Sequence, residues 1–464
     1  MGKEEINHND TICALATAPG GALGIIRISG PQSLEILSHI FTKNLSDARP
    51  NTIHYGHIVE HSDESTVVSQ HPIDEVLVSV FRAPHSYTGE DSAEISCHGS
   101  SYILNKVLDL LIHYGCRMAQ PGEYTMRAYL NGKLDLSQAE AVADLIASTN
   151  RATHHMAMSQ LRGHFSSELK VLRDQLLKLT SLLELELDFS DHEDLEFADR
   201  SELKALSVNI NEHITRLAHS FETGQALKQG VPVAIVGKTN VGKSTLLNRL
   251  LREDRAIVSN IHGTTRDTIE DTIDLHGVTF RFIDTAGIRQ TTDEIEQIGI
   301  ERTFAAIEKA RIVLWLIDQM PTEAEIADMV ERSKGRTLII VCNKIDLESH
   351  QNLQISIPDS QFVSISAKTG IGIPQLEEVI YRAADIPALN ESDIIVTNAR
   401  HYDALIRAHE SLQRVLDGMT SQLSGDLLAE DLRLALDQLA EITGTQITPN
   451  EVLGNIFKNF CVGK

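Results

Sequence analysis

The sequence has few cysteines, and they are scattered. It holds five in 464 residues, and no two of them form a Cys-x-x-Cys pair. An odd number at wide spacing favours neither a disulfide framework nor a zinc site. Long hydrophobic runs are missing too, since stretches such as Ile312 to Ile317 are too short to span a bilayer. The amino-terminal residues carry acids where a secretion signal needs bases and an apolar core. We therefore expect a cytoplasmic protein with no membrane segment.

Basic residues are also scarce relative to acids. The chain carries 41 Lys and Arg against 65 Asp and Glu, a formal net charge of −24. Such an acidic surface disfavours spontaneous docking on phosphate backbones, and with it a stand-alone nucleic-acid-binding protein. Hydrophobic residues at 42% and charged residues at 23% are typical of a globular protein. The length predicts about three domains, at the usual ~150 residues each.

The pattern of apolar residues divides the chain into four regions. Residues 1–133 predict an α+β domain, residues 134–229 a helical region, residues 230–385 a parallel α/β domain, and residues 386–464 helices again. The simplest interpretation is an α/β domain inserted into one discontinuous, all-α domain. The elements expected in the first domain are strands at Gly24 to Ser29, Ile53 to Val59, Glu75 to Phe81 and Ala93 to Cys97, and a helix at Tyr102 to His113.

The first functional motif of the inserted domain is a glycine-rich loop. Gly237 to Ser244 reads GKTNVGKS, and it lies between the apolar run Val233 to Val236 and a helical stretch. Strand, glycine-rich turn and helix amino terminus form the setting of a phosphate-binding loop. In such a loop, Lys243 lies against the β- and γ-phosphates and the Ser244 hydroxyl binds Mg²⁺. This loop predicts a nucleotide site.

Three further motifs follow in the order found in Ras-like GTPases. They are Asp284-Thr-Ala-Gly287, Asn343-Lys-Ile-Asp346 and Ser366-Ala-Lys368. The Asp284 carboxylate can reach Mg²⁺ through water, and the Gly287 N–H can face the γ-phosphate. Asp346 can accept from guanine N1–H and N2–H₂, a pairing that adenine does not offer, while Asn343 and Lys344 line the ring. The motifs therefore favour a Ras-like α/β domain that binds GTP over an ATPase or a kinase.

One position departs from the Ras-like pattern. Ras-like switches carry a water-orienting glutamine directly after Asp-x-x-Gly, but Ile288 stands there in this chain. An aliphatic side chain cannot hold a nucleophilic water, so another residue must complete hydrolysis. Composition does not choose among the nearby candidates, which are Arg289, Asp293, Glu294 and Glu296.

Four features together resemble one family. Besides the inserted GTPase domain, they are Gly263 to Asp267 (GTTRD), the amino-terminal TICALAT and GIIRISG runs, and the carboxy-terminal IFKNFCVGK. Arg127 to Ala141, RAYLNGKLDLSQAEA, adds to them, and neither this stretch nor Phe460 to Lys464 is a general GTPase motif. The chain resembles the MnmE (TrmE) family of tRNA-modification GTPases over essentially its whole length.

The resemblance implies a specific reaction. Members of the family act with a flavoprotein, MnmG, which carries FAD, and install a carboxymethylaminomethyl-type group at C5 of the wobble uridine, position 34, of certain tRNAs. A tetrahydrofolate derivative, in the 5-formyl or methylene form, supplies the one-carbon unit. The first domain would be a folate-binding-like domain that also forms the homodimer, and the dimer would join MnmG in a heterotetramer that holds the tRNA.

The resemblance also assigns residues of the GTPase site. A potassium ion would be held by Asn240, Ser259, Ile261 and Thr264, and Thr265 would join Ser244 on Mg²⁺. Glu296 would orient the attacking water through a second water, alongside Lys243 and Asp284. Without the family, Asn240 could equally be a loop spacer. The set expected to contact GTP is Asn240, Val241, Gly242, Lys243, Ser244, Thr245, Ser259, Asn260, Ile261, His262, Gly263, Thr264, Thr265, Asp284, Thr285, Ala286, Gly287, Asn343, Lys344, Asp346, Ser366, Ala367 and Lys368.

For folate, the family positions are Arg27, Glu94, Lys133 and Lys464. A carboxylate suits the pterin N3–H and amino group, and cations suit the glutamyl carboxylates. Taken singly, each could equally be a surface or interface charge. Cys461 matches a family cysteine with a proposed function, and a buried structural thiol is the alternative.

Two alternative hypotheses about function stay open. The first is a regulatory or ribosome-assembly GTPase without one-carbon chemistry. The second treats the first domain as a dimerisation scaffold only.

Overall fold

The structure is a computed structural model that describes residues 10–18, 20–60, 72–188, 200–254, 271–283, 304–347, 355, 357–358, 360–386, 393–445 and 463. The chain divides into two compact units. One comprises Met1–Ala147, Gln160–Asn211 and Arg407–Lys464, and the other comprises Ser148–Ser159 and Glu212–Ile406. Each is described by itself.

The amino-terminal part of the first unit is a six-stranded sheet in the order β3-β4-β5-β2-β1-β6. Its strands are β1 Ile12–Leu15, β2 Leu23–Ser29, β3 Thr52–Val59, β4 Pro72–Phe81, β5 Ser92–His98 and β6 Arg117–Met118. Helices α1 (Ser33–Ile40) and α2 (Ser101–His113) pack on one face, because alternate strand residues such as Ile26, Val78 and Ile95 are buried beneath them. The strands and the α2 helix expected here from the sequence are confirmed, and β1, α1 and β6 are additional.

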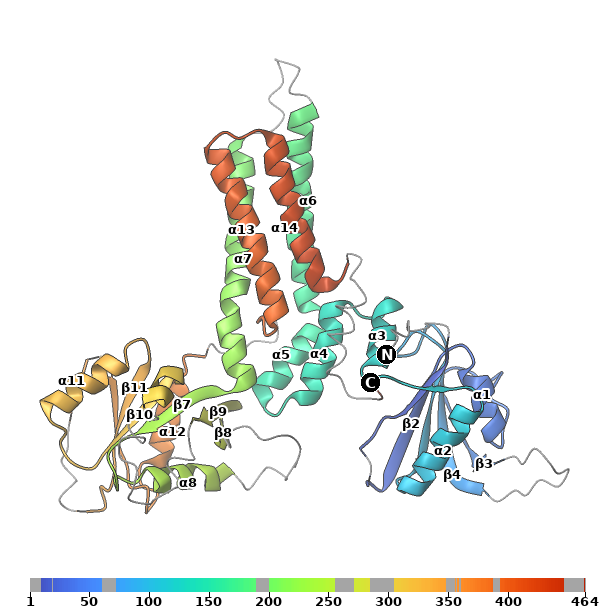
Figure 1. Cartoon of the computed structure of the whole chain (residues 1–464), viewed down its shortest axis with the longest axis horizontal. Coiled ribbons are helices and arrows are strands. Elements are labelled where there is room, and N and C mark those ends of the chain that lie inside the picture. Colours follow the sequence, from blue (N-terminus) through green and yellow to red (C-terminus); the bar gives the residue numbers. More distant parts are fainter. Residues whose placement is uncertain are drawn as a thin grey trace, which may run out of the picture. The chain divides into compact units, whose positions relative to one another are not determined.

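A helical region follows this sheet. Its helices are α3 Glu123–Leu130, α4 Leu136–Ala147, α5 Arg151–Leu161, α6 His164–Asp188, α7 Arg200–Gln229, α13 Ala399–Thr420 and α14 Gly425–Thr443. The parts of α6, α7, α13 and α14 that belong to the first unit run side by side as a bundle (Figure 1), whereas most of α5 and α7 and the start of α13 belong to the second unit. Buried leucines recur at helical spacing along α6, at Leu169, Leu172, Leu176 and Leu179, and this stripe explains why α6 packs against α14.

The second unit contains the other six-stranded sheet, in the order β12-β11-β10-β7-β9-β8. Its elements are β7 Val231–Val236, α8 Lys243–Asp254, β8 Asp271–Leu275, β9 Val278–Phe282, β10 Ile312–Ile317, α11 Glu323–Arg332, β11 Thr337–Cys342, β12 Ser360–Ser364 and α12 Ile373–Ala383. All neighbouring pairs are parallel except β8 with β9. Every residue of β10 is buried, as expected for a strand covered on both faces. The predicted parallel α/β domain is confirmed.

No helix among the described residues is long and apolar enough to cross a membrane.

Candidate functional site

The phosphate-binding loop joins β7 to α8 at the carboxyl edge of the parallel sheet. Residue Gly242 has φ +103°, and a Cβ there would collide with the side-chain amide of Asn343. Gly237 has φ +151°, and a Cβ there would collide with the carbonyl of Leu316. The loop therefore needs both glycines, for backbone conformation and for space. The loop opens onto the amino terminus of α8, where free N–H groups favour an anion.

Lys243, the first residue of α8, is directed back over the loop. Its Nζ donates to the carbonyls of Gly237 and Lys238, each at 2.7 Å. Burial lowers the pKa of this ammonium from its ordinary value. Ser244 follows it on the first turn of α8 and is half-buried. The lysine is thus placed at the position where phosphate oxygens are expected.

Asn343 joins two loops that lie far apart in the sequence. The side chain is buried, with 2% of its surface exposed. Its Nδ2 donates to the carbonyl of Val241 at 2.8 Å, and its Oδ1 accepts from the N–H of Ala367 at 2.9 Å. This side chain therefore braces the phosphate loop against the Ser366–Lys368 loop, a role the sequence analysis did not assign.

The residues expected to recognise the base are also held in place. The Ser366 hydroxyl donates to Asp346 Oδ1 at 2.7 Å, which orients the carboxylate expected to read guanine. Lys344 has φ +67°, and its Nζ pairs with Asp318 Oδ2 at 2.7 Å. Asp318 follows β10, so all these groups lie at the carboxyl ends of neighbouring parallel strands.

Two residues of this site were missed from the sequence. Arg249 of α8 donates through Nε to the Ala367 carbonyl at 3.3 Å and through Nη2 to the Lys368 carbonyl at 2.5 Å. Asp318 could have been found from the sequence, because it directly follows an apolar run, as the motif residues do. Arg249 gave no signal, because an arginine on a helix is ordinarily a solvated charge.

Part of the expected GTPase site lies outside the described residues. This holds for Ser259, Asn260, Ile261, His262, Gly263, Thr264, Thr265, Asp284, Thr285, Ala286, Gly287 and Glu296, and for the alternatives Arg289, Asp293 and Glu294. Cys461 and Lys464 lie outside them as well.

A second candidate site lies on the amino-terminal sheet. Arg27 on β2 and Glu94 on β5 are direct cross-strand partners, and Arg27 Nη2 lies 2.7 Å from Glu94 Oε1. Because side chains alternate along strands, Ser29 and Ser92 share the face of this pair, and they are cross-strand partners too. The face is the one opposite α1 and α2.

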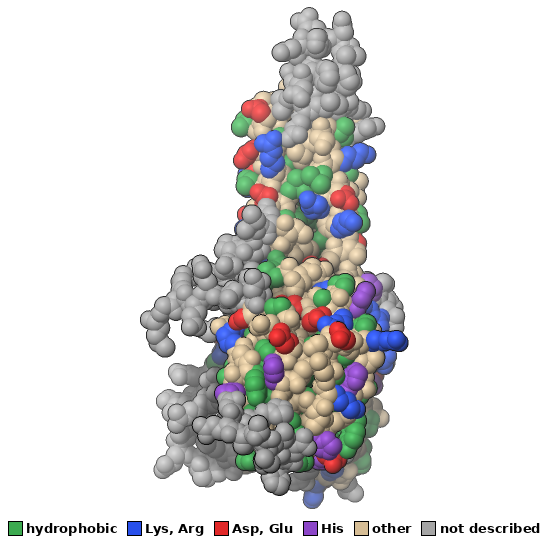
Figure 2. Space-filling model, turned by 90° about the vertical axis from the view of Figure 1, so that its right-hand side faces the viewer, with side chains coloured by type: hydrophobic (Ala, Val, Ile, Leu, Met, Phe, Trp, Pro, Cys, Tyr) green, Lys and Arg blue, Asp and Glu red, His purple; other side chains and the backbone are tan. Residues whose placement is uncertain are grey.

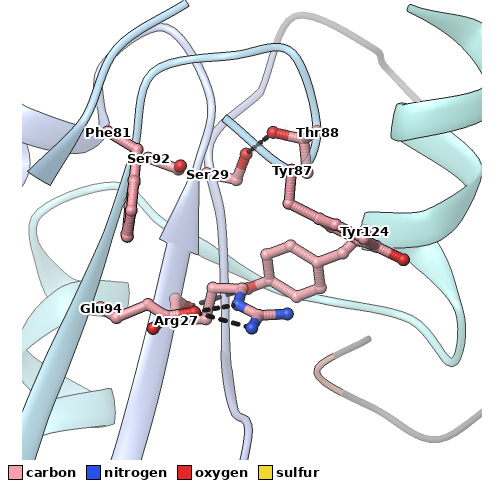
Figure 3. A pocket seen from close by; sticks show the side chains of 8 residues that line it. All are labelled: Arg27, Ser29, Phe81, Tyr87, Thr88, Ser92, Glu94 and Tyr124. Carbon is pink, nitrogen blue, oxygen red and sulfur yellow. Dashed lines mark hydrogen bonds and ion pairs between the residues drawn. The ribbon is translucent and has the colours of Figure 1, made fainter. Parts of the chain in front are cut away.

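A cavity of about 80 Å³ lies above this face, lined by Arg27, Ser29, Phe81, Tyr87, Thr88, Ser92, Glu94 and Tyr124. In Figure 3, the Ser29–Thr88 hydrogen bond and the Arg27–Glu94 ion pair lie at different ends of the group, with the rings of Tyr87 and Tyr124 beside them. The Arg27 guanidinium lies 5.8 Å from the Tyr87 ring centre and 5.6 Å from that of Tyr124. The cavity combines flat apolar rings with a carboxylate and a guanidinium.

The structure brings Arg27 and Glu94 together but not Lys133. Lys133 Nζ donates to the Pro84 carbonyl at 2.9 Å, next to the loop that carries Tyr87 and Thr88, and it does not line the cavity. Arg27 Nη1 also donates to the Gly463 carbonyl at 3.1 Å, so residue 463 lies at this site. Ser29 and Ser92 could have been found from strand alternation around Arg27 and Glu94.

The described residues contain no group of three or more His, Cys, Asp or Glu side chains arranged to hold a metal ion.

A lysine-bearing phosphate loop, a doubly wound parallel sheet and a guanine-type Asn-Lys-x-Asp motif at its carboxyl edge define a GTP hydrolase of the Ras-like P-loop class. Two family models together match almost the whole chain: the GTP-binding protein TrmE N-terminus over residues 11–133 and the MnmE helical domain over residues 136–461. The chain belongs to the MnmE family of tRNA modification GTPases.

Curated relatives match almost end to end. The tRNA modification GTPase MnmE of Phocaeicola vulgatus is 54% identical, over 98% of this chain and 99% of its own. The protein of the same name from Bacteroides thetaiotaomicron is 55% identical, over 98% and 100%. Among solved structures, the G domain of the T. maritima FeoB iron transporter is 24% identical, covers 33% of this chain and 98% of its own, and has a TM-score of 0.25.

Proposed function

We propose that this protein hydrolyses GTP to drive a folate-dependent modification of tRNA. With a flavoprotein partner, MnmG, it adds a carboxymethylaminomethyl-type group at C5 of the uridine at position 34. The observation that carries the proposal is that one chain, similar along its length to proteins named tRNA modification GTPase MnmE, holds both a braced nucleotide site and a ring-lined cavity with paired Arg27 and Glu94.

Metal ions complete the nucleotide site in this proposal. Ser244 and Thr265 would hold Mg²⁺, which neutralises phosphate charge when bound. Asn240, Ser259, Ile261 and Thr264 would hold K⁺, whose positive charge would take the place of an arginine finger. The Asn240 side chain is exposed and makes no hydrogen bond within the described part of the chain, so its amide oxygen is available as a hard ligand. Lys243 would lie against the β- and γ-phosphates.

Folate is the ligand proposed for the cavity on the first sheet. Glu94 would accept from the pterin N3–H and amino group, and the rings of Tyr87 and Tyr124 would border its flat face. The cavity volume of about 80 Å³ is below the ~300–1,000 Å³ of most ligand sites. Binding therefore requires Arg27 to leave Glu94, and the freed guanidinium would meet a glutamyl carboxylate, as Lys133 and Lys464 would.

The homodimer is proposed to form through the uncovered face of the first sheet. Apolar side chains stand exposed there, with 66% of Leu23, 67% of Ile53, 54% of Tyr55 and 47% of Leu77 accessible. Tyr55 and Leu77 are cross-strand partners, and Ile53 lies on the same face two residues from Tyr55, so these three side chains form one exposed apolar area. A monomer rarely leaves such an area in water, and a second copy would cover it.

The acidity of the chain supports a partner for tRNA binding. On the face shown in Figure 2, acidic and basic side chains are interspersed, and the described residues there form no broad basic area. The flavoprotein would supply most of the basic surface, while this chain supplies GTP hydrolysis and folate. The complex would work in the cytoplasm.

Mass spectrometry of tRNA nucleosides from cells that lack the gene tests the proposal. We expect the modified wobble uridine to disappear and to return when the wild-type gene is restored. Unchanged uridines would favour a regulatory GTPase. Titration of the full-length protein with 5-formyltetrahydrofolate separates a folate site from a dimerisation scaffold, because a scaffold would give no saturable binding.

A further inference from the structure

A buried ionic network lies behind the cavity on the first sheet. At its centre is Arg127 of α3, with 2% of its surface exposed. Its Nη2 lies 2.5 Å from Asp10 Oδ1 and 3.1 Å from Glu123 Oε1. Arg117 pairs with the same two carboxylates, each at 2.6 Å. Asp10 and Glu123 therefore balance the charge of the two arginines by themselves.

Glu90 is a third carboxylate on this network, and charge balance does not require it. Arg127 Nη1 lies 3.2 Å from its Oε1 and 3.3 Å from its Oε2. Burial lowers the pKa of the Arg127 guanidinium, but the nearby carboxylates of Glu90 and Glu123 more than offset this and raise its pKa. A carboxylate that faces a guanidinium through both oxygens acts as a hydrogen-bond acceptor.

Glu90 also contacts the wall of the cavity. The Ser29 hydroxyl donates to Glu90 Oε2 at 2.8 Å, and Ser29 Oγ lies 2.7 Å from Thr88 Oγ1. Both residues line the cavity, and both are almost fully buried, at 0% and 1% exposed. Because a hydroxyl has one hydrogen and Ser29 gives its hydrogen to Glu90, Thr88 donates to Ser29. Figure 3 shows this pair beside the rings.

The direction of these hydrogen bonds decides what the wall offers a ligand. With both hydrogens used inside the network, Ser29 and Thr88 have only lone pairs left to offer a ligand in the cavity. Thr88 Oγ1 also accepts from the Glu90 N–H at 3.3 Å, so one lone pair of Thr88 Oγ1 remains for a ligand. Such a wall pairs with N–H groups and is repelled by ring nitrogens that carry lone pairs.

We propose that Glu90 is a positioning residue that fixes the Ser29 and Thr88 hydroxyls as acceptors, so that the cavity selects a reduced pterin over an oxidised one. Reduction of the pyrazine ring turns N5 and N8 from acceptors into N–H donors, and 5-formyltetrahydrofolate keeps the donor at N8. This inference rests on the proposed folate function and names the residues that set its specificity for the reduced ring.

The supporting loop is well placed for this role. Its residues 86–90 are tied to α3 at two further points. The Tyr87 hydroxyl lies 2.9 Å from Thr125 Oγ1, and Asn131 Nδ2 donates to the Thr88 carbonyl at 2.7 Å. Substitution of Glu90 alone therefore leaves the loop attached to the helix.

The test measures a ratio of affinities in the full-length protein. Dissociation constants for 5-formyltetrahydrofolate and for folic acid are compared in the wild type, in Glu90→Gln and in Thr88→Val. A glutamine at position 90 can donate to Ser29 and reverse the hydrogen-bond direction, and valine removes one hydroxyl while keeping the shape. Loss of one such hydrogen bond predicts that the preference for the reduced ligand falls about tenfold. Glu35→Gln, an exposed residue of α1 with the same change of charge, is the control and keeps the wild-type ratio.

The possible outcomes separate the folate function from the role of Glu90. If the wild type binds neither folate, the proposed folate function and this inference both fail. If the wild type binds both folates equally, or if Glu90→Gln and Thr88→Val keep the full preference, folate binding stands and the role of Glu90 is refuted. A general structural weakening would lower both affinities together and leave the ratio unchanged. Should Glu90→Gln fail to fold, Thr88→Val decides alone, because it does not touch Arg127.

Discussion

Replacement of Asn343 by alanine should weaken both the stability and the nucleotide affinity of the GTPase domain. The side chain is 98% buried, and it satisfies the Val241 carbonyl and the Ala367 N–H, whose residues are 3% and 2% exposed. Loss of one partner leaves a buried polar group unsatisfied, at a cost of about 1–3 kcal/mol. Two such groups predict about 2–6 kcal/mol of lost unfolding free energy, and less where the loops can admit water.

The chain offers a local probe for this measurement. Trp315 is its single tryptophan, and it is buried in β10 of the same sheet. Urea unfolding followed by tryptophan fluorescence therefore reports on this domain and not on the amino-terminal domain. Fluorescent GDP titration then measures affinity, which we expect to fall at least tenfold because the phosphate loop and the Ser366–Lys368 loop lose their brace.

The control is Asn248→Ala, an exposed asparagine on α8, which should change stability by no more than about 0.5 kcal/mol. If Asn343→Ala behaved like this control in unfolding, and bound GDP within twofold of the wild type, the bracing role would be refuted.

Four further outcomes are expected. Glu296→Ala should bind GTP within twofold of the wild type but hydrolyse it about 10²–10⁴ times more slowly, and unchanged turnover in a phosphate-release assay would remove Glu296 from catalysis. Potassium chloride should support faster hydrolysis than sodium chloride at equal ionic strength, so equal rates would count against the K⁺ site formed with Asn240. Asp346→Asn should weaken GDP binding more than tenfold, since the amide keeps only one acceptor oxygen and sets an N–H₂ group against the other guanine donor, and an intact affinity would contradict the guanine assignment. Without its flavoprotein, the protein should bind tRNA weakly and with strong salt dependence in filter-binding assays, and tight binding that persists at high salt would contradict the proposed division of labour.

The sequence was most informative where residues act close to one another in the chain. The phosphate loop is recognisable because its glycines, Lys243 and Ser244 lie within eight residues between a strand and a helix. The other motif residues follow apolar strands, and parallel strands bring their carboxyl ends to one edge, so their convergence was predictable. Strand β8 was not singled out, although Thr272 to Leu275 alternate polar and apolar side chains as a half-buried strand does.

Contacts between distant residues could not be predicted in the same way. Asn343 and Val241 are 102 residues apart, and Arg127 and Glu90 are 37 apart. Their contacts depend on the order of the strands in the sheet and on how α3 packs. Neither of these can be predicted from residues that are neighbours in the sequence. Arg27 and Glu94 were singled out through family resemblance, whereas Thr88 and the two tyrosines emerged only from the cavity itself.

The central claim is that the GTPase site and the cavity on the first sheet serve one reaction. Complementation of cells that lack the gene tests it most directly, with the wobble uridines of total tRNA measured by mass spectrometry. We predict that the wild-type gene restores the modified uridine, while Ser244→Ala, in the nucleotide site, and Glu94→Gln, in the cavity, each fail although both proteins accumulate. Full modification by either variant would contradict the claim that both sites are required.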